Sequence, residues 1–597
     1  MKRLGATASA LRDPFALALL GVLALALGLR LWGIRYGLPV AYSIDERSHF
    51  VPRAVAYFSS GSLDPQYQLN PSGLIEWIAA SLAVVYRSRQ RVVDTWQTDP
   101  GEIWTIARIA SALLSTAAVA LIYAAGARLY DRKVGLLAAA LLATCFLPVH
   151  YGHFALNDAP SLAPTALALF AIAGVLRFGR ARDYALAGIA IGFAVGMKYN
   201  AVYLLAPLLT AATLRATGRF DSLGARGGER RIGPALTGLA LAGVGTAAGF
   251  LISDPYAILD LARFRHDVAH LSDYTTGGLL LGETQRNGHL YYLWSIGWGF
   301  GFVPAALAVA GGVVLLVRDR VSALLLIPAA LIFFAYIGAQ GRYFARYVMP
   351  LFPIFSLLAA VGAIWLASWL AARVKLAGRR AALLAIAVGA LACAQGVIYA
   401  VHNDVVLSRE DTRTATRAWM VAHIPAGTRI LVEPLVPQEW YRDGGLPVSD
   451  RTQRGFRWTR FIRTRSDIER LAERHPLSRR NADFHNYPYT LFPGLFDYYR
   501  RRGVCWLVSG SGQTGRAFNN PRRVPEAIAY YTRLPREAQL RFQSSPFGEP
   551  GDGPEHPFHW DKSHNYYSLA YERPGVVMRV YQLRRCAPGQ GPIQRPR

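Results

Sequence analysis

The sequence predicts a polytopic α-helical membrane protein that ends in a small external α/β domain. Of its 597 residues, 52% are hydrophobic and only 17% are charged, whereas a soluble domain has about 25% charged residues. The apolar residues also gather in long runs, such as 15–31 and 232–252, and each run is close to the roughly 20 residues that a spanning helix needs. We therefore expect a membrane domain over residues 1–401 and a soluble domain over residues 402–597.

About eleven transmembrane helices are expected. Their predicted ranges are 14–34, 103–126, 134–149, 159–176, 184–197, 201–214, 232–252, 290–317, 321–337, 347–370 and 381–401. Short basic loops alternate along this series, with clusters that begin at Arg128, Arg177, Arg215, Arg318 and Arg373. The positive-inside rule makes these loops cytoplasmic, together with an N terminus that carries Lys2, Arg3 and Arg12. An odd number of spans then places the C-terminal domain outside.

Residues 71–88 are apolar enough to form a twelfth span. Inserting this span would reverse every later loop and place the basic clusters outside. We therefore expect an interfacial helix within a long first external loop, 35–102, with Trp77 and Tyr86 in the headgroup zone.

The high positive charge of the chain is accounted for by its membrane topology. Much of the formal net charge of +27 lies in the short loops between apolar runs, where Lys and Arg fix orientation. The sequence has no basic stripe with interleaved aromatic residues, so no nucleic-acid partner is expected.

The predicted soluble domain has mixed secondary structure. It contains β-like runs at 429–433, 504–509 and 576–583, and a helical pattern at 413–423 that ends before the Pro425–Gly427 stop signal. Cys505 and Cys586 could form a disulfide if this domain is outside the cytoplasm. The sequence does not place the two thiols within bonding distance.

The unusual polar residues fall at the external ends of the predicted spans. In chain order they are Asp45, Glu46 and His49; His150, His153, Asn157 and Asp158; Lys198, Tyr199 and Asn200; Asp254 and Tyr256; and Arg342, Tyr343, Arg346 and Tyr347. Ionisable groups at membrane depth are costly, so they are functional candidates. Acids and bases on one face suit a cavity that binds an anionic headgroup and also supplies a general base.

Each of these signals also has an ordinary alternative. An Asp-Glu pair after a span is often part of a solvated loop, and Lys198 could snorkel from a helix end. Arg342 and Arg346, at i, i+4 spacing, could clamp a phosphate or touch lipid phosphates. His150 and His153 could bind a metal or be satisfied by water and backbone. Lys198 favours phosphate binding because the chain has only five lysines among 65 basic residues.

Together the residues resemble the GT-C class of polyprenyl-phosphate-dependent glycosyltransferases, specifically the protein O-mannosyltransferase and aminoarabinose-transferase group. The resemblance runs nearly from end to end, and the acidic pair Asp45-Glu46 is its most specific motif. It also includes Gly37-Leu38-Pro39, Gly61 to Pro65, Asn70-Pro71-Ser72, Ala155 to Pro160, Gly192 to Asn200, Arg342 to Pro353, and Asp411-Thr412-Arg413 through Trp419 to Pro425-Ala426-Gly427. The chain departs from many relatives at Leu69-Asn70-Pro71-Ser72, where they carry Tyr-Pro-Pro or Tyr-Pro-Ser.

The resemblance implies inverting transfer of a sugar from a polyprenyl-phosphate carrier to a hydroxyl acceptor, at the external face of a bacterial inner membrane. Asp45 would take the acceptor proton, and Glu46 and Asp158 would orient the acceptor or hold Asp45 in place. Lys198, Arg342 and Arg346 would stabilise the departing phosphate. The remaining candidate cavity residues are His49, His153, Asn157, Tyr199 and Tyr343. The reaction requires no cofactor, and a role for a metal stays open.

The expected partners are the lipid-linked sugar donor, membrane lipids, and an acceptor in lipid A, protein or envelope glycan. The sugar would be a hexose or a pentose. Two other classes remain as alternatives: a lipid or sugar transporter, and a membrane-anchored sensor without activity. A transporter predicts charges near mid-helix or two symmetric halves, which the sequence does not show. The sensor hypothesis does not explain the presence of Asp45, Asp158 and Lys198.

Overall fold

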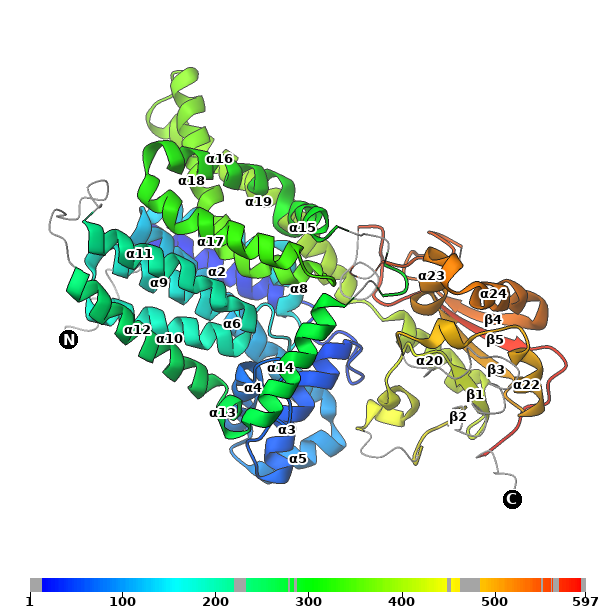
Figure 1. Ribbon diagram of the computed structural model, residues 1–597. Helices are drawn as coiled ribbons and strands as arrows, with labels where there is room; N and C mark the ends of the chain where they lie inside the picture. The colour runs from blue at the N-terminus through cyan, green and yellow to red at the C-terminus, as the bar shows by residue number, and fades with distance from the viewer. Residues whose placement is uncertain are drawn as a thin grey trace.

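The computed structural model describes residues 13–218, 232–277, 280–283, 287–447, 453–461, 484–548, 551–559, 561 and 569–591. Figure 1 shows a bundle of helices with a smaller domain, built around a β-sheet, beyond one end of it. The fold class predicted from the sequence is therefore confirmed. Lys2, Arg3, Arg12 and most of the predicted basic loop 215–231 lie outside the described residues.

All eleven predicted spans are helical. They are α2 (Pro14–Leu31), α6 (Pro100–Leu129), α7 (Arg132–Thr144) with α8 (Phe146–Gly152), α9 (Leu162–Phe178), α10 (Ala181–Met197), η2 (Tyr199–Leu204) with α11 (Leu205–Thr217), α12 (Ile232–Ser253), α15 (Gly288–Ile296) with η4 (Gly297–Gly301) and α16 (Phe302–Arg318), α17 (Arg320–Gly338), η5 (Ala345–Leu351) with α18 (Phe352–Arg373), and α19 (Gly378–Leu407).

Length and composition divide these helices into two groups. Among the described residues, seven helical runs are long and apolar enough to cross a membrane, and the bent pair α7 and α8 makes an eighth. The helices α9, α10 and α11 have 17, 17 and 13 residues, fewer than the roughly 20 that a straight span needs. For these three helices, membrane crossing stays a prediction.

Glycines bring α10 and α12 into close contact. A Cβ added at Gly188 would overlap the backbone oxygen of Ala242, and one added at Gly192 would overlap that of Thr246. Small residues allow such close approach of helices in membranes. This packing fixes the end of α10, where Lys198 follows.

The long loop between α2 and α6, predicted to be external, folds into a group of short helices: η1 (Glu46–Phe50), α3 (Val51–Ser60), α4 (Gly73–Tyr86) and α5 (Arg89–Thr98). The 14 residues of α4 extend about 21 Å at 1.5 Å per residue, which is short of a hydrocarbon core of about 30 Å. Figure 1 shows α4 beside α3 and α5 at one end of the bundle. This length fits the interfacial helix predicted for 71–88.

A second long connection, between α12 and α15, contains α13 (Tyr256–Leu259) and α14 (Leu261–Thr276). Near its start, α14 contacts the first loop, because Asp267 Oδ2 accepts a hydrogen bond from Gln68 N at 2.8 Å. At its other end, Thr275 O accepts from the backbone N–H groups of Gly341 and Arg342. The helix therefore extends from the first loop to the segment that precedes η5.

The C-terminal domain contains a five-stranded sheet in the order β2-β1-β3-β5-β4. The strands are β1 (Arg429–Val432), β2 (Thr459–Arg460), β3 (Trp506–Gly510), β4 (Ala538–Ser544) and β5 (Met578–Leu583). Both neighbours of β1 are parallel to it, whereas β5 runs antiparallel to β3 and β4. Three strands and one helix fall where the sequence predicts them, namely β1, β3, β5 and α20 (Thr412–His423).

Further helices pack around this sheet (Figure 1). They are α22 (Leu495–Arg501), α23 (Ser511–Asn519) and α24 (Pro525–Glu537), with short 3-10 turns η6 (Gln438–Tyr441), η7 (Asp443–Gly445), η9 (Tyr487–Thr490) and η10 (Pro521–Arg523). Cys505 and Cys586 form a disulfide, with their Cα atoms 5.6 Å apart. The pairing that the sequence left open is therefore present, and it links the start of β3 to the segment after β5.

The domain is joined to the bundle by a short connection and held by side chains. Between the end of α19 at Leu407 and the start of α20 at Thr412 lie only the four residues 408–411. The Tyr36 hydroxyl donates to Asp411 Oδ2 at 3.0 Å, and the Arg413 guanidinium lies 3.9 Å from the centre of the Tyr42 ring. These contacts bind the start of the domain to the long loop between α2 and α6.

Candidate functional site

Four charged side chains from four separate segments meet at the end of the bundle that faces the C-terminal domain. Arg346 Nη2 lies 2.6 Å from Asp45 Oδ2, and Arg346 Nε lies 4.0 Å from Asp158 Oδ2. The other oxygen of Asp158 accepts from the Lys198 ammonium. The side chains form one continuous series of ion pairs, Asp45–Arg346–Asp158–Lys198, which we call the charge cluster.

Local changes in backbone structure place three of the four members of the charge cluster. Asp45 precedes the π-helical turn η1, and such turns are frequent at functional sites. Lys198 is the extended residue between α10 and the 3-10 turn η2, and Arg346 is in the 3-10 turn η5. Lys198 and Arg346 therefore lie where the chain departs from α-helical geometry, and Asp45 lies directly before such a departure.

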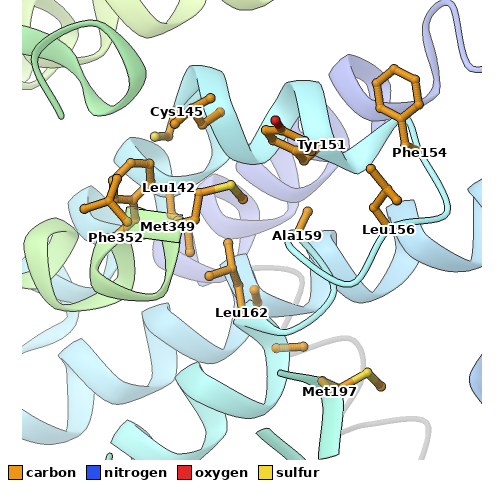
Figure 2. Close-up of a cluster of buried hydrophobic side chains, with 14 of the residues drawn as sticks. Leu142, Cys145, Tyr151, Phe154, Leu156, Ala159, Leu162, Met197, Met349 and Phe352 are labelled. Atoms are coloured by element: carbon orange, nitrogen blue, oxygen red, sulfur yellow. The ribbon is translucent and has the colours of Figure 1, made fainter. Parts of the chain in front are cut away.

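Buried apolar neighbours anchor the charge cluster. Ala159, Met197 and Met349 are buried in one apolar core, and each lies within three residues of Asp158, Lys198 or Arg346 in the sequence. Figure 2 shows these three side chains with others of the same core, including Leu142 and Leu162. The charged groups are therefore held by segments whose other side chains are packed.

Exposure differs sharply within the charge cluster. Asp45 is 33% exposed, whereas Asp158 is only 5% exposed. Burial acts to raise the pKa of Asp45, but the Arg346 guanidinium outweighs it and holds this pKa below its ordinary value. Asp45 is therefore the accessible carboxylate of the cluster and is ionised at neutral pH.

His49 lies beside the accessible carboxylate. Its Nε2 atom is 3.9 Å from Asp45 Oδ1, and its ring stacks on Tyr67 with the ring centres 5.0 Å apart. Burial lowers the pKa of His49, against the pull of Asp45. A neutral imidazole in this position can exchange hydrogen bonds with an acceptor hydroxyl near Asp45.

Glu46 faces away from the charge cluster. It is fully buried, and its two oxygens bind Arg108 Nε and Nη2, each at 2.8 Å. Oε1 also accepts from Ala155 N at 2.9 Å. The sequence places Glu46 among the catalytic residues, with the acceptor as one target. Because both Glu46 oxygens are occupied by Arg108, the structure supports the second suggested role, which is to hold the segment that carries Asp45 in place.

The structure also places Arg342 and Tyr343 outside the charge cluster. The Arg342 guanidinium lies over the Tyr274 ring of α14, 4.0 Å from its centre. Tyr343 is buried against Tyr291, with the ring centres 4.7 Å apart. The i, i+4 pair expected from Arg342 and Arg346 does not share a helix face, because this segment is extended at Phe344 and then turns as a 3-10 helix.

Three further candidates make structural contacts. His153 is buried between Trp32 O and Asp404 Oδ1, at 2.8 and 3.2 Å from its Nε2 atom. The Asn157 amide donates to Met197 O at 2.8 Å, which joins the loop of Asp158 to the end of α10. The Tyr199 hydroxyl donates to Gln68. Asn157 and Tyr199 therefore border the site, whereas His153 connects α8 to α19.

The histidine pair does not form a metal centre. His150 Nδ1 lies 2.8 Å from Asn403 Oδ1, while His153 contacts Asp404. Among the residues that the structure describes, no group of three or more His, Cys, Asp or Glu side chains is arranged to hold a metal ion.

Two residues at the site are not predicted from the sequence. Tyr151 of α8 is 1% exposed, its hydroxyl has no hydrogen-bond partner in the described part of the chain, and the charges of Arg346, Asp158 and Asp45 act on it. From the C-terminal domain, Asp561 Oδ2 accepts from the N–H of Ala345 at 3.3 Å. A tyrosine in an apolar run suggests ordinary core, and no local pattern marks Asp561.

Comparison with known proteins supports the expected resemblance. Residues 101–223 match the family model for dolichyl-phosphate-mannose-protein mannosyltransferase. This segment contains Asp158 and Lys198, so the resemblance to polyprenyl-phosphate-dependent glycosyltransferases is confirmed there. No curated protein sequence matches the chain.

Two solved structures have a limited similarity to the chain. The apo oligosaccharyltransferase of Archaeoglobus fulgidus has a TM-score of 0.49 and 14% identity, covering 90% of this chain and 74% of that chain. ArnT from Cupriavidus metallidurans bound to undecaprenyl phosphate has a TM-score of 0.44 and 14% identity, covering 96% and 99%. Both scores are below 0.5, so the functional assignment depends on the family match and on the residues of the site.

Proposed function

We propose that the protein is an inverting glycosyltransferase that moves a sugar from a polyprenyl-phosphate carrier to a hydroxyl acceptor. The observation that carries the proposal is the charge cluster, in which an accessible carboxylate, Asp45, adjoins two cations that could bind phosphate, Arg346 and Lys198. The family match over residues 101–223 supports the same class of donor.

In the proposed reaction, Asp45 removes the proton of the acceptor hydroxyl. The acceptor oxygen forms a bond to the anomeric carbon as the bond from that carbon to the phosphate oxygen breaks. Polyprenyl phosphate leaves with the electron pair, and Lys198 and Arg346 stabilise its added charge. Phosphate is a good leaving group, so the reaction needs neither a strong general acid nor a cofactor.

The ion pairs of the free protein suggest how the donor activates the base. Arg346 now pairs with Asp45 and approaches Asp158. A donor phosphate would compete for the Arg346 guanidinium, because charge-assisted bonds from arginine to phosphate are strong. As this cation turns toward phosphate, the pKa of Asp45 rises and its carboxylate becomes a stronger base. Donor binding before acceptor deprotonation follows as the productive order.

We place the reaction at the external face of a bacterial inner membrane, with the C-terminal domain in the periplasm. The acceptor would be lipid A, a protein or an envelope glycan. Cys505 is fully buried and disulfide-bonded, which makes it a poor labelling probe. Exposed positions serve better, so an impermeant thiol reagent should label Gln539→Cys in intact spheroplasts. It should label Lys133→Cys only after lysis, and the reverse pattern would contradict this topology.

The direct test is sugar transfer by the purified full-length protein in nanodiscs. Synthetic polyprenyl-phosphate mannose and aminoarabinose would be offered with envelope fractions as acceptors, and Asp45→Asn protein would be the control. We expect one donor to yield labelled product, in the presence of EDTA as well as without it. If the protein in liposomes moved the donor across the membrane without transferring its sugar to any acceptor, it would instead be a transporter.

A further inference from the structure

A cavity of about 280 Å³ lies between the first external loop and the C-terminal domain. The loop contributes Arg47, Trp96 and Gln97, helix α6 contributes Trp104, and the domain contributes Glu439 and Pro447. None of the four members of the charge cluster lines it. The cavity is therefore separate from the site described above, and domain interfaces are a common location for ligand sites.

The cavity lies next to the short helix η1, which directly follows the proposed base Asp45. Arg47 follows Asp45 by two residues, and residues two apart on a helix point to different faces. Asp45 is turned toward Arg346, whereas Arg47 Nη1 donates to Ala41 O at 3.2 Å on the cavity side. Asp45, just before η1, therefore faces the charge cluster, whereas Arg47, within η1, faces the cavity.

The lining is rigid. Pro39, Pro52, Pro100 and Pro447 contribute to it, and proline has a fixed φ angle. The loop and the domain also touch tightly at its rim, because a Cβ added at Gly445 would lie 2.9 Å from Val40 Cγ2. A cavity that is already formed requires little ordering when a ligand binds.

The chemistry of the lining selects one class of ligand. Trp96 and Trp104, with ring centres 5.7 Å apart, supply apolar surface. Arg47 and Glu439 carry opposite charges, so the cavity has no net attraction for an anion, and a hydrocarbon would leave both groups without partners. A neutral sugar ring offers both an apolar face for the tryptophans and hydroxyl groups for Arg47 and Glu439. Its C–H face covers the indole, and its hydroxyls accept from Arg47 and donate to Glu439.

We propose that this cavity is a second binding site, specific for a neutral saccharide unit. Its volume is just below the range of about 300–1,000 Å³ for drug-sized ligands, which suits one or two sugar rings. The proposal goes beyond the transfer reaction, and its test requires no turnover.

The test measures binding of methyl α-mannoside and of maltose to the full-length protein in nanodiscs without donor. Saturation-transfer NMR reports the contact, and intrinsic tryptophan fluorescence gives the affinity. We expect saturable binding that weakens at least about tenfold, or ~1.4 kcal/mol, in Trp96→Ala and in Glu439→Gln. Trp369→Ala, which removes a 44% exposed tryptophan of α18, should bind as wild type does.

A second control separates this site from the reaction. Asp45→Asn protein should retain saccharide binding even though transfer is lost. The proposal is overturned if neither sugar binds saturably, if Trp96→Ala and Glu439→Gln bind as wild type does, or if Asp45→Asn abolishes the signal. Failure of transfer with intact saccharide binding would count against the proposed function alone.

One further arm identifies the source of the sugar. Nanodiscs that contain a neutral glycosyl diacylglycerol are compared with nanodiscs of phospholipid only. Competition between this lipid and free maltose would support the site and assign it to a lipid-borne sugar. Unchanged maltose binding would support the site and assign it to a soluble glycan.

Discussion

Asp45 and Glu46 are neighbours in the chain and carboxylates of the same charge, yet they belong to two very different ion-pair systems. Glu46 and Arg108 are fully buried, and Arg108 donates two hydrogen bonds to the Glu46 carboxylate. Arg108 Nη1 also donates to Ile34 O and Tyr36 O. In the charge cluster, Arg346 makes one close contact with Asp45, which remains one-third exposed. The first system is saturated, whereas the second keeps bonding capacity for a substrate.

This contrast shows how to separate structural from reactive charge. A buried pair whose donors and acceptors are all occupied fixes geometry and has nothing left to offer a ligand. In the charge cluster, neighbouring ion pairs share Arg346 and Asp158, and Asp45 at one end is accessible. These ion pairs can rearrange when a phosphate binds. Four predictions test this distinction.

The largest effect is expected for Asp45→Asn, which preserves size but cannot accept a proton. Loss of a general base costs about 100- to 10,000-fold in turnover. Donor affinity should survive, because Lys198 and Arg346 remain. Turnover and donor affinity measured in nanodiscs check both statements. Turnover within a few fold of wild type would move the role of base to Asp158.

Arg108→Ala should act on stability rather than on donor recognition. It leaves Glu46 buried with only Ala155 N as a partner, and breaking one side of a buried ion pair costs about 3–5 kcal/mol. Thermal unfolding in nanodiscs measures the loss. Arg132→Ala is the matched control, because its pair with Asp13 is exposed and its removal should change unfolding little. Equal stability of the two variants would disprove the contrast.

Lys198→Ala and Arg346→Ala should weaken donor binding. Each removes a charge-assisted bond to phosphate of about 1.5–3 kcal/mol, equivalent to roughly a 10- to 150-fold loss of affinity. Arg342→Ala is the control, since its guanidinium lies over Tyr274. An equal loss in Arg342→Ala would show that this residue joins the phosphate site when donor is bound, as the sequence predicts.

The smallest effect concerns pH. Asp45 must be ionised to act as a base, so kcat/KM falls as the pH drops through its pKa. Arg346 holds this pKa down against burial, and its removal in Arg346→Ala should raise the pKa and move the acidic limb to higher pH by about 1 unit or more. Arg346→Lys retains the charge and should shift the limb less. An unmoved limb in Arg346→Ala would exclude Asp45 as the group that titrates.

Much of the fold follows from the sequence because long apolar runs that alternate with short basic loops are typical of polytopic membrane proteins and rare in soluble ones. The four members of the charge cluster are also identifiable from the sequence, because ionisable groups at membrane depth are costly and therefore mark functional candidates. The partner of Glu46 was not identified, although Arg108 lies inside the predicted span 103–126 and a charge there signals a buried partner. Asp561 could not be found in this way, because tertiary packing alone brings it to Ala345.

Because the connection between α19 and α20 has only four residues, the C-terminal domain and the helical bundle associate within one molecule. A short tether keeps the two surfaces at a high effective concentration, so their association carries almost none of the cost of a bimolecular encounter. Contacts as few as those of Tyr36 with Asp411 and Tyr42 with Arg413 can then hold the domain in register. If the bundle and the domain were expressed as two separate chains, their association would carry the full free-energy cost of a bimolecular encounter.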